Sequence, residues 1–362
     1  MNYARRVGAL LAALETHNLD ALLVTHLPNI RYLCGFTGSA GALVLSARGA
    51  RFFTDGRYTA QAQEEVLGAD ISVMRKAPFM AAAEWLSRIS LRSRMWRVGV
   101  DGEHMTLAEH TRLAKFLPRR IRLKQAPPLV EQARMIKDVD ELARLRRAVH
   151  VGSSLFDTLL RRIRPGVREI EVARAIEARA RKAGAEAMSF ETIIASGKRS
   201  AMPHGAASGL PIPARAFVVC DFGVILDGYC SDMTRTVYVG RVPAEARAFY
   251  NAVREAQQAA LDTVRPGVEV SKVDRAARKV LHNARLERYF THSTGHGVGL
   301  EIHESPRVAA GQQEVLRPGM VITVEPGAYV PGRWGVRIED MVVVTREGCD
   351  VLTPTPKDLI AI

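Results

Sequence analysis

Four acidic residues in the C-terminal part of the sequence have the types and spacing of a metal site. Asp221 and Asp232 form one pair, Glu325 and Glu339 form another, and each pair lies among apolar, strand-forming residues. A single acid is ordinarily a surface or turn residue. Four buried carboxylates, in contrast, repel one another and must take up protons or gain a compensating cation. A pair of divalent ions would supply that compensation.

The two pairs are related by an internal repeat that is visible in this sequence alone. Arg-Pro-Gly-Val at residues 164–167 recurs at 265–268, each time before a stretch rich in Ala and Arg. Further along the chain, 218–223 matches 322–327, and the segments around the second acid of each pair match in turn. The offset between the copies grows only slowly, as expected when loops lengthen after a duplication.

The repeat predicts how the acids are brought together. In each half we expect a helix, a strand, a turn and a second strand, with one acid in each strand. The first pair would be joined through the turn at 226–228 and the second through 331–335. A pseudo-two-fold arrangement of these hairpins would place all four carboxylates at one point between the halves.

Three histidines lie close together in the sequence between the two acidic pairs. His292, His296 and His303 belong to the segment 292–304 and are interleaved with glycines. Glycine allows the backbone to pack closely beside a site, and imidazoles supply ligands or proton carriers near neutral pH. One histidine alone is more often structural, but three in so short a segment indicate a functional site.

The N-terminal part of the chain reads as a separate layer. Residues 1–125 alternate between strand-like runs and segments rich in Ala, Glu and Leu, which predicts an α/β layer with a sheet of its own. The strand-like runs are 20–25, 42–45, 51–54 and 97–100.

A domain boundary is expected shortly after this layer. Two consecutive prolines at 127–128 interrupt the chain. A long helix should begin at Asp138, because Glu141 stands in capping-box spacing three residues on. We therefore predict two domains, 1–128 and 129–362.

The composition is that of a globular protein. Of 362 residues, 47% are hydrophobic and 25% are charged, and no run approaches the roughly 20 apolar residues of a membrane span. Arg5 and Arg6 precede a short apolar run at 8–14 without a cleavage site, which predicts an amphipathic helix rather than a signal peptide. The four cysteines are scattered, which predicts reduced thiols. We expect a cytoplasmic protein without a membrane partner.

The formal net charge of +13 raises the question of a nucleic-acid partner. The basic residues are spread along the chain, with one short cluster at 119–124. No zinc finger, aromatic–basic RNA motif or recognition-helix pattern accompanies them. We therefore predict a solvated basic surface and no nucleic-acid binding.

Taken with these motifs, the sequence resembles the metallopeptidases of the pita-bread fold, and among them the proline-specific branch of aminopeptidase P and prolidase (Xaa-Pro dipeptidase). The resemblance covers essentially the whole chain. Segments 29–32 and 35–41 are similar to the creatinase-like N-terminal domain of that branch. The motifs that carry the C-terminal resemblance are 231–236, 295–297, 324–327 and 336–340. The resemblance implies an α/β two-domain protein, with a creatinase-like α/β N-terminal domain and a pita-bread α+β catalytic domain containing an internal pseudo-two-fold repeat.

The resemblance further implies a site for two divalent metal ions per subunit. Asp221 would hold one ion, His296 and Glu325 would hold the other, and Asp232 and Glu339 would bridge both. The assignment agrees with the repeat, since the two bridging acids are repeat partners and so are the two terminal ones. Four oxygen donors against one imidazole make a hard site, which favours Mn²⁺, with Co²⁺ or Zn²⁺ as substitutes.

Roles for the surrounding residues are also implied by the resemblance. His204 matches a catalytic histidine that contacts substrate and stabilises the tetrahedral intermediate. His292 and His303 match residues around the scissile imide and the proline pocket. Tyr329 matches a tyrosine near the site, although a buried structural tyrosine fits the sequence nearly as well. Arg337 resembles a residue that orients metal ligands.

The implied reaction is hydrolysis of the Xaa-Pro bond by a metal-activated bridging hydroxide, with Glu325 as the proton acceptor. Arg307 could clamp the free carboxylate of a Xaa-Pro dipeptide, and an exposed loop arginine is the equal alternative. We expect a Xaa-Pro dipeptidase, with aminopeptidase P, which acts on longer peptides, as the alternative. The resemblance also suggests a homodimer.

Other members of the same fold class have different functions. Methionine aminopeptidase usually lacks a creatinase-like domain, and creatinase works without a metal. Non-catalytic pita-bread modules that bind histones or nucleic acid typically lose metal ligands. The complete ligand set in this sequence therefore favours a metallopeptidase.

Overall fold

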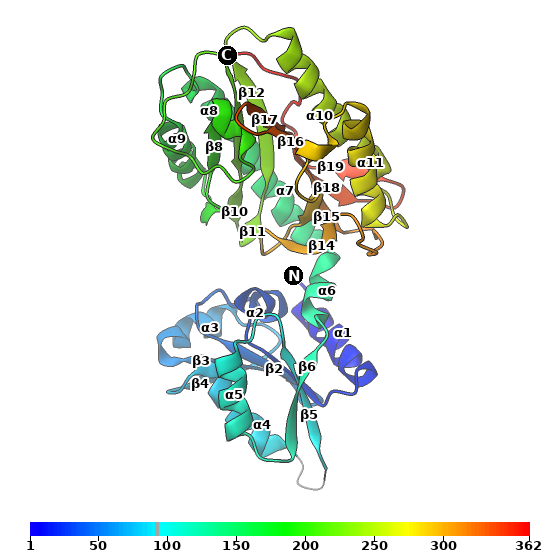
Figure 1. Cartoon of the computed structure of the whole chain (residues 1–362). Helices are drawn as coiled ribbons and strands as arrows, with labels where there is room; N and C mark the ends of the chain where they lie inside the picture. Colours follow the sequence, from blue (N-terminus) through cyan, green and yellow to red (C-terminus); the bar gives the residue numbers. More distant parts are fainter. Residues whose placement is uncertain (91–93) are drawn as a thin grey trace. The chain divides into compact units, whose positions relative to one another are not determined.

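The computed structural model describes residues 1–90 and 94–362, and the chain divides into two compact units (Figure 1). Unit 1 comprises Met1–Arg134 and unit 2 comprises Met135–Ile362. Helix α6 (Leu129–Met135) ends at this division, whereas the predicted boundary between 128 and 129 lies at its start. Each unit has a sheet structure and a hydrophobic core of its own.

Unit 1 is built on a mixed sheet whose described strands have the order β4-β3-β2-β1-β5-β6. The pairs β1–β2 and β2–β3 are antiparallel, and β1–β5, β5–β6 and β3–β4 are parallel. Both β1 and β2 are buried along their whole length, which explains why they read as continuous apolar runs. The strands are β1 (Ala21–Val24), β2 (Ala42–Ser46), β3 (Gly49–Asp55), β4 (Asp70–Met74), β5 (Trp96–Asp101) and β6 (Ile121–Ala126).

Helices pack on this sheet through apolar faces. Leu86 of α4 and Leu113 of α5 belong to the same core as Leu23 and Val98 of the sheet. The predicted amphipathic first helix is present as α1, which buries Val7, Leu10 and Leu14. The helices of this unit before α6 are α1 (Tyr3–Thr16), α2 (Leu27–Cys34), α3 (Thr59–Glu65), α4 (Pro78–Ile89) and α5 (Leu107–Phe116), with the 3₁₀ turn η1 (Gly56–Tyr58).

Unit 2 is formed around small antiparallel sheets. Two of them belong to the first half of the repeat, with the strand orders β12-β9-β8 and β11-β10-β7, and two to the second, with the orders β14-β13-β15-β18-β19 and β16-β17. The strands of the first half are β7 (Ala187–Met188), β8 (Ile193–Ser196), β9 (Ala216–Phe222), β10 (Val224–Leu226), β11 (Tyr229–Cys230) and β12 (Met233–Val239). Those of the second half are β13 (Gly295–Gly297), β14 (Glu304–Val308), β15 (Val321–Val324), β16 (Gly327–Val330), β17 (Trp334–Arg337), β18 (Asp340–Val344) and β19 (Cys349–Val351).

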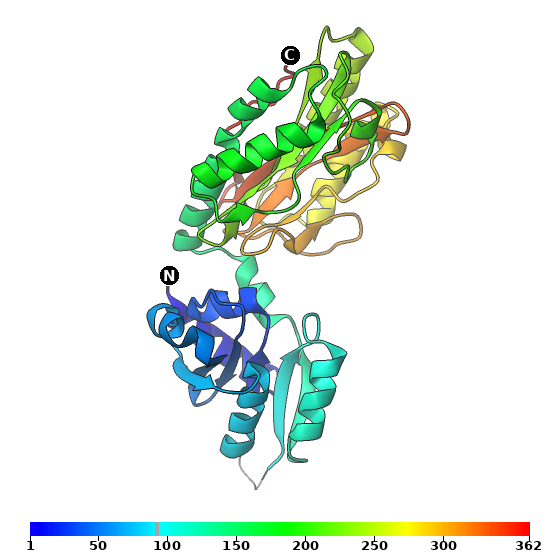
Figure 2. The same ribbon diagram turned by 90° about the vertical axis from the view of Figure 1, so that its left-hand side faces the viewer.

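Helices cover the strands of unit 2 on their outer side. One core joins α8 and α9 to β8, β9 and β12, and another joins α10 and α11 to β15, β17 and β18. Figures 1 and 2 both show the strands of unit 2 lying between these two helix pairs. The helices are α7 (Val139–Ser154), α8 (Phe156–Arg162), α9 (Glu169–Lys182), α10 (Ala244–Thr263) and α11 (Val270–Asn283), with the 3₁₀ turns η2 (Gly197–Ala201) and η3 (Glu287–Tyr289).

The internal repeat is present in the backbone. Both Arg-Pro-Gly-Val segments precede a helix, α9 in one half and α11 in the other. Their glycines, Gly166 and Gly267, have φ angles of 84° and 82°, a left-handed conformation that favours glycine. The capping box predicted at the start of α7 is also present, since the Asp138 and Glu141 side chains each accept a hydrogen bond from the other residue's backbone N–H.

One detail of the predicted hairpins is wrong. We expected each acid within a strand, but only Asp221 lies inside one, in β9. Asp232 precedes β12, Glu325 follows β15 and Glu339 precedes β18. These three acids stand where the chain passes from one small sheet to the next. In the first half β9–β12 and β10–β11 belong to different sheets, and in the second half so do β15–β18 and β16–β17. The break after β15 coincides with the turn-favouring pair Pro326-Gly327, whereas no proline or glycine marks the breaks before β12 and β18.

Two other predictions concerned membrane-spanning segments and the state of the cysteines. None of the helices formed by residues 1–90 and 94–362 is both long and apolar enough to cross a membrane. Cys34, Cys220 and Cys349 are free thiols. Burial raises the pKa of the Cys34 thiol to about 12, so this group is an inert part of the core rather than a nucleophile.

Candidate metal centre

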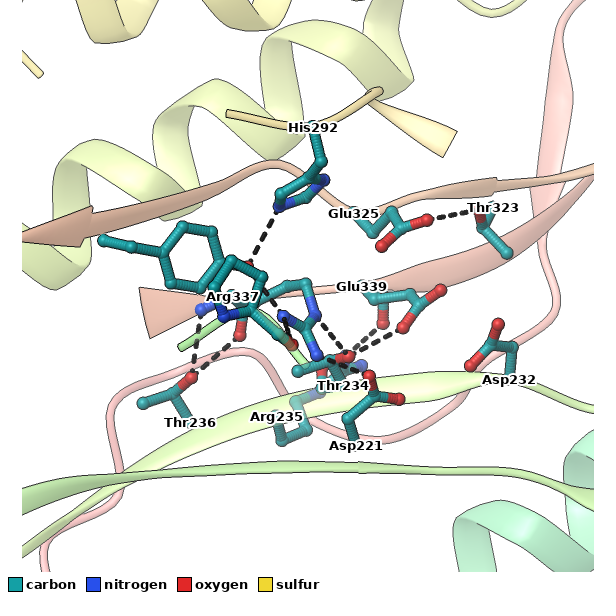
Figure 3. Close-up of polar contacts among 12 residues, drawn as sticks. Asp221, Asp232, Thr234, Arg235, Thr236, His292, Thr323, Glu325, Arg337 and Glu339 are labelled. Atoms are coloured by element: carbon teal, nitrogen blue, oxygen red, sulfur yellow. Dashed lines mark hydrogen bonds and ion pairs between the residues drawn. The ribbon is translucent and has the colours of Figure 1, made fainter. Parts of the chain in front are cut away.

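The four predicted acids converge in unit 2. Figure 3 shows the carboxylates of Asp221, Asp232, Glu325 and Glu339 turned toward one region between the two halves of the repeat. Asp221, Asp232 and Glu339 are 8%, 5% and 1% exposed. The strand junctions described above place these acids opposite one another, so the sequence repeat becomes a cluster of buried negative charge.

Burial and mutual repulsion dominate the electrostatics of the bridging pair. The pKa of Asp232 is well above its ordinary value, first because burial removes water from the carboxylate and then because Glu339 and Asp221 repel its charge. The pKa of Glu339 is likewise well above its ordinary value, through burial and repulsion from Glu325 and Asp221. Without a cation, both groups therefore favour their protonated forms.

His296 faces this cluster from β13 with a nitrogen suited to a metal. Its Nδ1 lies 3.0 Å from the carbonyl oxygen of Gly297, which can only accept, so Nδ1 carries the proton. Its Nε2 lies 3.3 Å from Glu325 Oε1 and 3.6 Å from Asp232 Oδ2. The hydrogen bond to the backbone thus orients the ring so that Nε2 faces the carboxylates: protonated, it donates to Glu325, and deprotonated, it offers a lone pair to a metal.

Glu325 differs from its acidic neighbours. Burial acts to raise its pKa, but the hydrogen bond and positive charge of His296 outweigh burial and bring the pKa below its ordinary value. Thr323 supports the same carboxylate, because its hydroxyl donates to Glu325 Oε1 at 3.3 Å and accepts from the His296 backbone N–H at 3.0 Å. Glu325 is therefore the acid in this cluster that is ionised most readily.

Arg337 connects the centre to its surroundings. Its side chain is buried and donates to Asp221 Oδ2, to Thr234 Oγ1 at 3.1 Å and to the Tyr329 hydroxyl at 2.6 Å. The same hydroxyl lies 3.0 Å from His292 Nε2 (Figure 3). These contacts hold one oxygen of Asp221 in place and leave the other free to face the cluster.

The residues fit a divalent cation. Ligand atoms of Asp232, His296 and Glu339 all lie within 4.8 Å of one another. Asp221 Oδ1 and Glu339 Oε1 are buried oxygens that no hydrogen-bond donor satisfies among the described residues. Buried anionic oxygens without partners are costly, and an ion bound between them removes that cost. Oxygen donors with one imidazole suit a hard or borderline divalent ion.

The remaining predicted residues are arranged around this cluster. The ring of His303 lies 4.4 Å from that of His296 in an edge-to-face arrangement. His204 is exposed on the loop after η2. Burial lowers the pKa values of His292 and His303, and the charge of His204 acts in the same direction. Arg307 lies exposed in β14, and no ion pair joins it to the acids in the part of the chain that the structure describes.

Sequence reasoning did not single out Thr234, although it lies within the quoted motif 231–236. Its hydroxyl donates to Glu339 Oε2 at 2.7 Å while it accepts from Arg337 Nε. Thr323 was missed in the same way. A threonine that alternates with apolar residues in a strand is an ordinary pattern, and its partners become visible only in three dimensions.

A second group of potential ligands lies in unit 1. His26, Asp101, His104 and Glu131 also have ligand atoms within 4.8 Å of one another. The rings of His26 and His104 are stacked, with centroids 3.6 Å apart and planes at 7°. An imidazole binds a metal through a lone pair in the ring plane, and parallel planes do not aim two lone pairs at one ion. This group is therefore less suited to a cation than the cluster in unit 2.

Comparison with known proteins agrees with this geometry. A sequence profile of metallopeptidase family M24 matches residues 143–346, and one of the creatinase/prolidase N-terminal domain matches residues 6–136. A Xaa-Pro dipeptidase of Pyrococcus horikoshii is 33% identical over 356 residues, which are 98% of each chain.

Solved structures of similar proteins cover the whole chain. A Xaa-Pro dipeptidase from Bacillus anthracis has a TM-score of 0.95 with 38% identity and covers 100% of both chains. An X-Pro aminopeptidase from Thermotoga maritima has a TM-score of 0.88 with 32% identity, covering 99% of this chain and 100% of its own. With its creatinase-like N-terminal domain, its pita-bread catalytic domain and its buried carboxylate cluster, this chain belongs to metallopeptidase family M24.

Proposed function

We propose that this chain is a dinuclear metal-dependent peptidase that hydrolyses the bond between any first residue and a following proline. The observation that carries the proposal is the pair of buried, unpartnered oxygens, Asp221 Oδ1 and Glu339 Oε1, beside the ligand atoms of Asp232 and His296. The names of the relatives support proline specificity, since Xaa-Pro peptidases match over nearly the whole chain.

The proposed ligand set is the one expected from the sequence. The residues that would hold the two ions are Asp221, Asp232, His296, Glu325 and Glu339. When bound, two divalent ions supply a Lewis-acidic centre that lowers the pKa of a water molecule toward neutrality. We propose Mn²⁺ as the native ion because four carboxylates outnumber one imidazole in this set.

Glu325 is the proposed proton acceptor. Its pKa lies below the ordinary value because the influence of His296 exceeds the effect of burial, so the carboxylate is ionised at neutral pH. An ionised carboxylate beside the attacking water can take its proton. The imide nitrogen of proline carries no hydrogen, so the leaving group must receive a proton as the bond breaks, and protonated Glu325 is the proposed donor.

The histidines and Tyr329 form the proposed substrate-contacting wall. Burial holds the pKa of His292 below its ordinary value, so its ring is neutral at pH 7. The neutral ring can form a hydrogen bond with the Tyr329 hydroxyl or with a substrate. His204 is exposed and free to reach a bound peptide. We propose that His204 stabilises the oxyanion formed on the scissile carbonyl, and that His303 lines the proline pocket.

Two substrate classes are compatible with this site. Dipeptides are preferred here because the P. horikoshii and B. anthracis relatives are named Xaa-Pro dipeptidases, and Arg307 is the proposed clamp for the free carboxylate. The similarity to an X-Pro aminopeptidase supports longer peptides as the alternative. The cytoplasmic location and the homodimer stay predictions.

The test is a comparison of two peptides on the same enzyme. The protein is stripped with chelator, reloaded with Mn²⁺, and assayed for release of alanine from Ala-Pro and from Ala-Pro-Ala. Cleavage of the dipeptide, with loss of affinity in the Arg307→Ala variant, would support the dipeptidase. Preference for the tripeptide would favour aminopeptidase P. Absence of cleavage with metal bound would contradict proline specificity.

A further inference from the structure

The loop that carries His204 is attached to one buried carboxylate outside the metal centre. Glu169, the first residue of α9, is 0% exposed. Its Oε1 accepts from the backbone N–H of Ser196 at 2.7 Å and from the hydroxyl of Ser196 at 2.8 Å. Its Oε2 accepts from Arg199 Nε at 3.0 Å and from the backbone N–H and hydroxyl of Ser208 at 3.1 and 2.6 Å. One side chain therefore holds both ends of the segment 196–208.

The middle of this segment is held by polar contacts as well. Arg199 donates from Nη2 to the carbonyl oxygen of Ala206 at 2.5 Å. Ser200 accepts from the backbone N–H of Gly335 at 2.9 Å, and Arg337 donates to the carbonyl oxygen of Pro203 at 3.0 Å. Because Arg337 also donates to Asp221, the loop is connected to the metal centre at the residue just before His204.

Little apolar burial supports the same segment. From 197 to 208, only Ser200 and Gly205 are buried, and neither has an apolar side chain. Ordering a loop costs conformational entropy, which here must be offset mainly by hydrogen bonds. Hydrogen bonds to a charged acceptor are stronger than those between neutral groups. Glu169 and the guanidinium of Arg199 are thus the strongest supports of the loop.

The other half of the molecule has a comparable arrangement. Asp274 of α11 is 1% exposed and accepts from Thr294 Oγ1 and from Arg278 Nε, both at 2.8 Å. Arg278 in turn donates to the carbonyl oxygen of His292 at 2.7 Å. In each half, a buried acid and an arginine fix the backbone of a segment that bears a histidine of the site.

We infer that Glu169 is a positioning residue that holds His204 at the substrate side of the metal centre. It touches none of the proposed metal ligands and acts only through the loop. The inference rests on the proposed function, in which His204 contacts substrate. A displacement of about 1 Å in a group that contacts the reacting atoms can lower the rate by about 10²-fold.

The variant Glu169→Gln tests this role. It keeps the size of the side chain but removes the charge and turns a hydrogen-bond donor toward groups that themselves donate. We expect kcat for Ala-Pro to fall by about 10–100-fold while bound Mn²⁺ stays at the wild-type level. The matched control is Glu171→Gln, because Glu171 is two residues on, exposed, and paired with Arg168 at the surface. This control should retain wild-type activity.

A double-mutant cycle separates positioning from general support of the fold. If Glu169 acts through His204, then Glu169→Gln should cost little further activity in a His204→Ala background. If Glu169→Gln lowers kcat by the same factor in the wild type and in the His204→Ala background, the two residues act independently and the inference is overturned. Wild-type activity in Glu169→Gln would overturn it as well.

Hydrogen exchange supplies a readout that does not require substrate. We expect the amides of 197–208 to exchange faster in Glu169→Gln and at the wild-type rate in Glu171→Gln. If His204→Ala is fully active, the proposed role of His204 fails, whereas unchanged exchange in this loop would refute the anchor itself. Should Glu169→Gln not fold, Ser208→Ala removes the hydroxyl that donates to Glu169 and accepts from the Leu210 backbone N–H, and the same loop amides should then exchange faster.

Discussion

Neighbouring carboxyl groups in the metal centre respond differently to the same burial. Asp232 and Glu339 have other carboxylates as their principal neighbours, and their pKa values rise. Glu325 has His296 beside it, and its pKa falls although burial acts in the opposite direction. The environment of each residue therefore separates carboxyl groups whose protonated form is favoured by burial and repulsion from the one that ionises most readily.

These pKa directions predict how the metal-free protein responds to pH. A carboxyl group whose pKa is raised by folding contributes stability below its ordinary pKa, and that contribution is lost as pH rises through the raised value. Asp232 and Glu339 have this sign, and so has Asp221. Glu325 has the opposite sign, but its contribution changes only below its ordinary pKa. Among the histidines, the lowered pKa values of His292 and His303 oppose the raised pKa of His296. The chelated protein should thus lose stability between about pH 5 and about pH 7.5.

The variant Asp232→Asn isolates this effect. Removing one ionisable group should raise the Tm of the chelated protein at about pH 7.5 more than at about pH 5, with roughly 2–4 °C for each kcal/mol gained. Thermal unfolding with and without Mn²⁺ measures it, and the variant should also lose the stabilisation that the ion gives the wild type. A drop in Tm of the same size at both pH values would show that burial and repulsion by neighbouring carboxylates do not destabilise ionised Asp232.

Arg337 offers a second prediction at this scale. Lysine keeps the charge but cannot reach Asp221, Thr234 and Tyr329 together, as the guanidinium does. Arg337→Lys should therefore weaken metal affinity by about 10–100-fold, as loss of a residue that orients a ligand commonly does. Calorimetric titration of the chelated protein with Mn²⁺ gives this number. The control is Arg333→Lys, because Arg333 forms a surface ion pair with Glu245. Equal affinities in wild type and Arg337→Lys would exclude the orienting role.

The proposed metal ligands could be predicted from the sequence, but the residues that hold the surrounding loops in place could not. Asp221, Asp232, Glu325 and Glu339 could be found because the repeat places them in matching positions. Glu169 could not, because nothing in the sequence distinguishes an acid that receives five hydrogen bonds from one that faces water. Partners of this kind depend on tertiary packing and have no local pattern.

At the scale of elements, the strand junctions of unit 2 decide where the acids point. The strands predicted in unit 1 are confirmed, with 20–25 observed as β1 (Ala21–Val24) and 97–100 as β5 (Trp96–Asp101). Apolar runs bounded by turn residues mark such buried strands well. The breaks before β12 and β18 could not be predicted, because the residues on both sides of each break suit a strand.

The close packing of β13 against β15 at Gly295 predicts the effect of a substitution there. A Cβ atom at Gly295 would lie 2.0 Å from the carbonyl oxygen of Thr323, which is backbone and cannot move aside. Gly295→Ala should therefore separate the two strands and displace the adjacent His296, at a cost of about 1–3 kcal/mol or more. Thermal unfolding should show a lower Tm, and titration with Mn²⁺ should show weaker binding.

The control for this substitution is Gly348→Ala. A Cβ atom at Gly348 would meet no atom within 4 Å, and the residue does not have a positive φ angle. Its Tm and Mn²⁺ affinity should equal those of the wild type within error. A Gly295→Ala protein with both properties unchanged would contradict the close approach of the strands seen here.

At the scale of the whole molecule, the two units have separate cores, and the residues of the proposed active site lie in only one of them. The carboxylate cluster, His292, His296 and the His204 loop all belong to unit 2, in which the sequence repeat supplies the symmetry. The basic surplus of +13 is spread over the chain and has no part in the cluster. The family assignment thus depends on both units, whereas the chemistry follows from the second.

The most direct test of this account is hydrolysis of Ala-Pro measured against the number of ions bound. Chelated protein would be titrated with Mn²⁺, and bound ion and initial rate would be determined on the same samples. We predict no activity without metal and a rate that saturates when two ions are bound per chain. Undiminished hydrolysis in the fully chelated protein, or none with both ions bound, would contradict it.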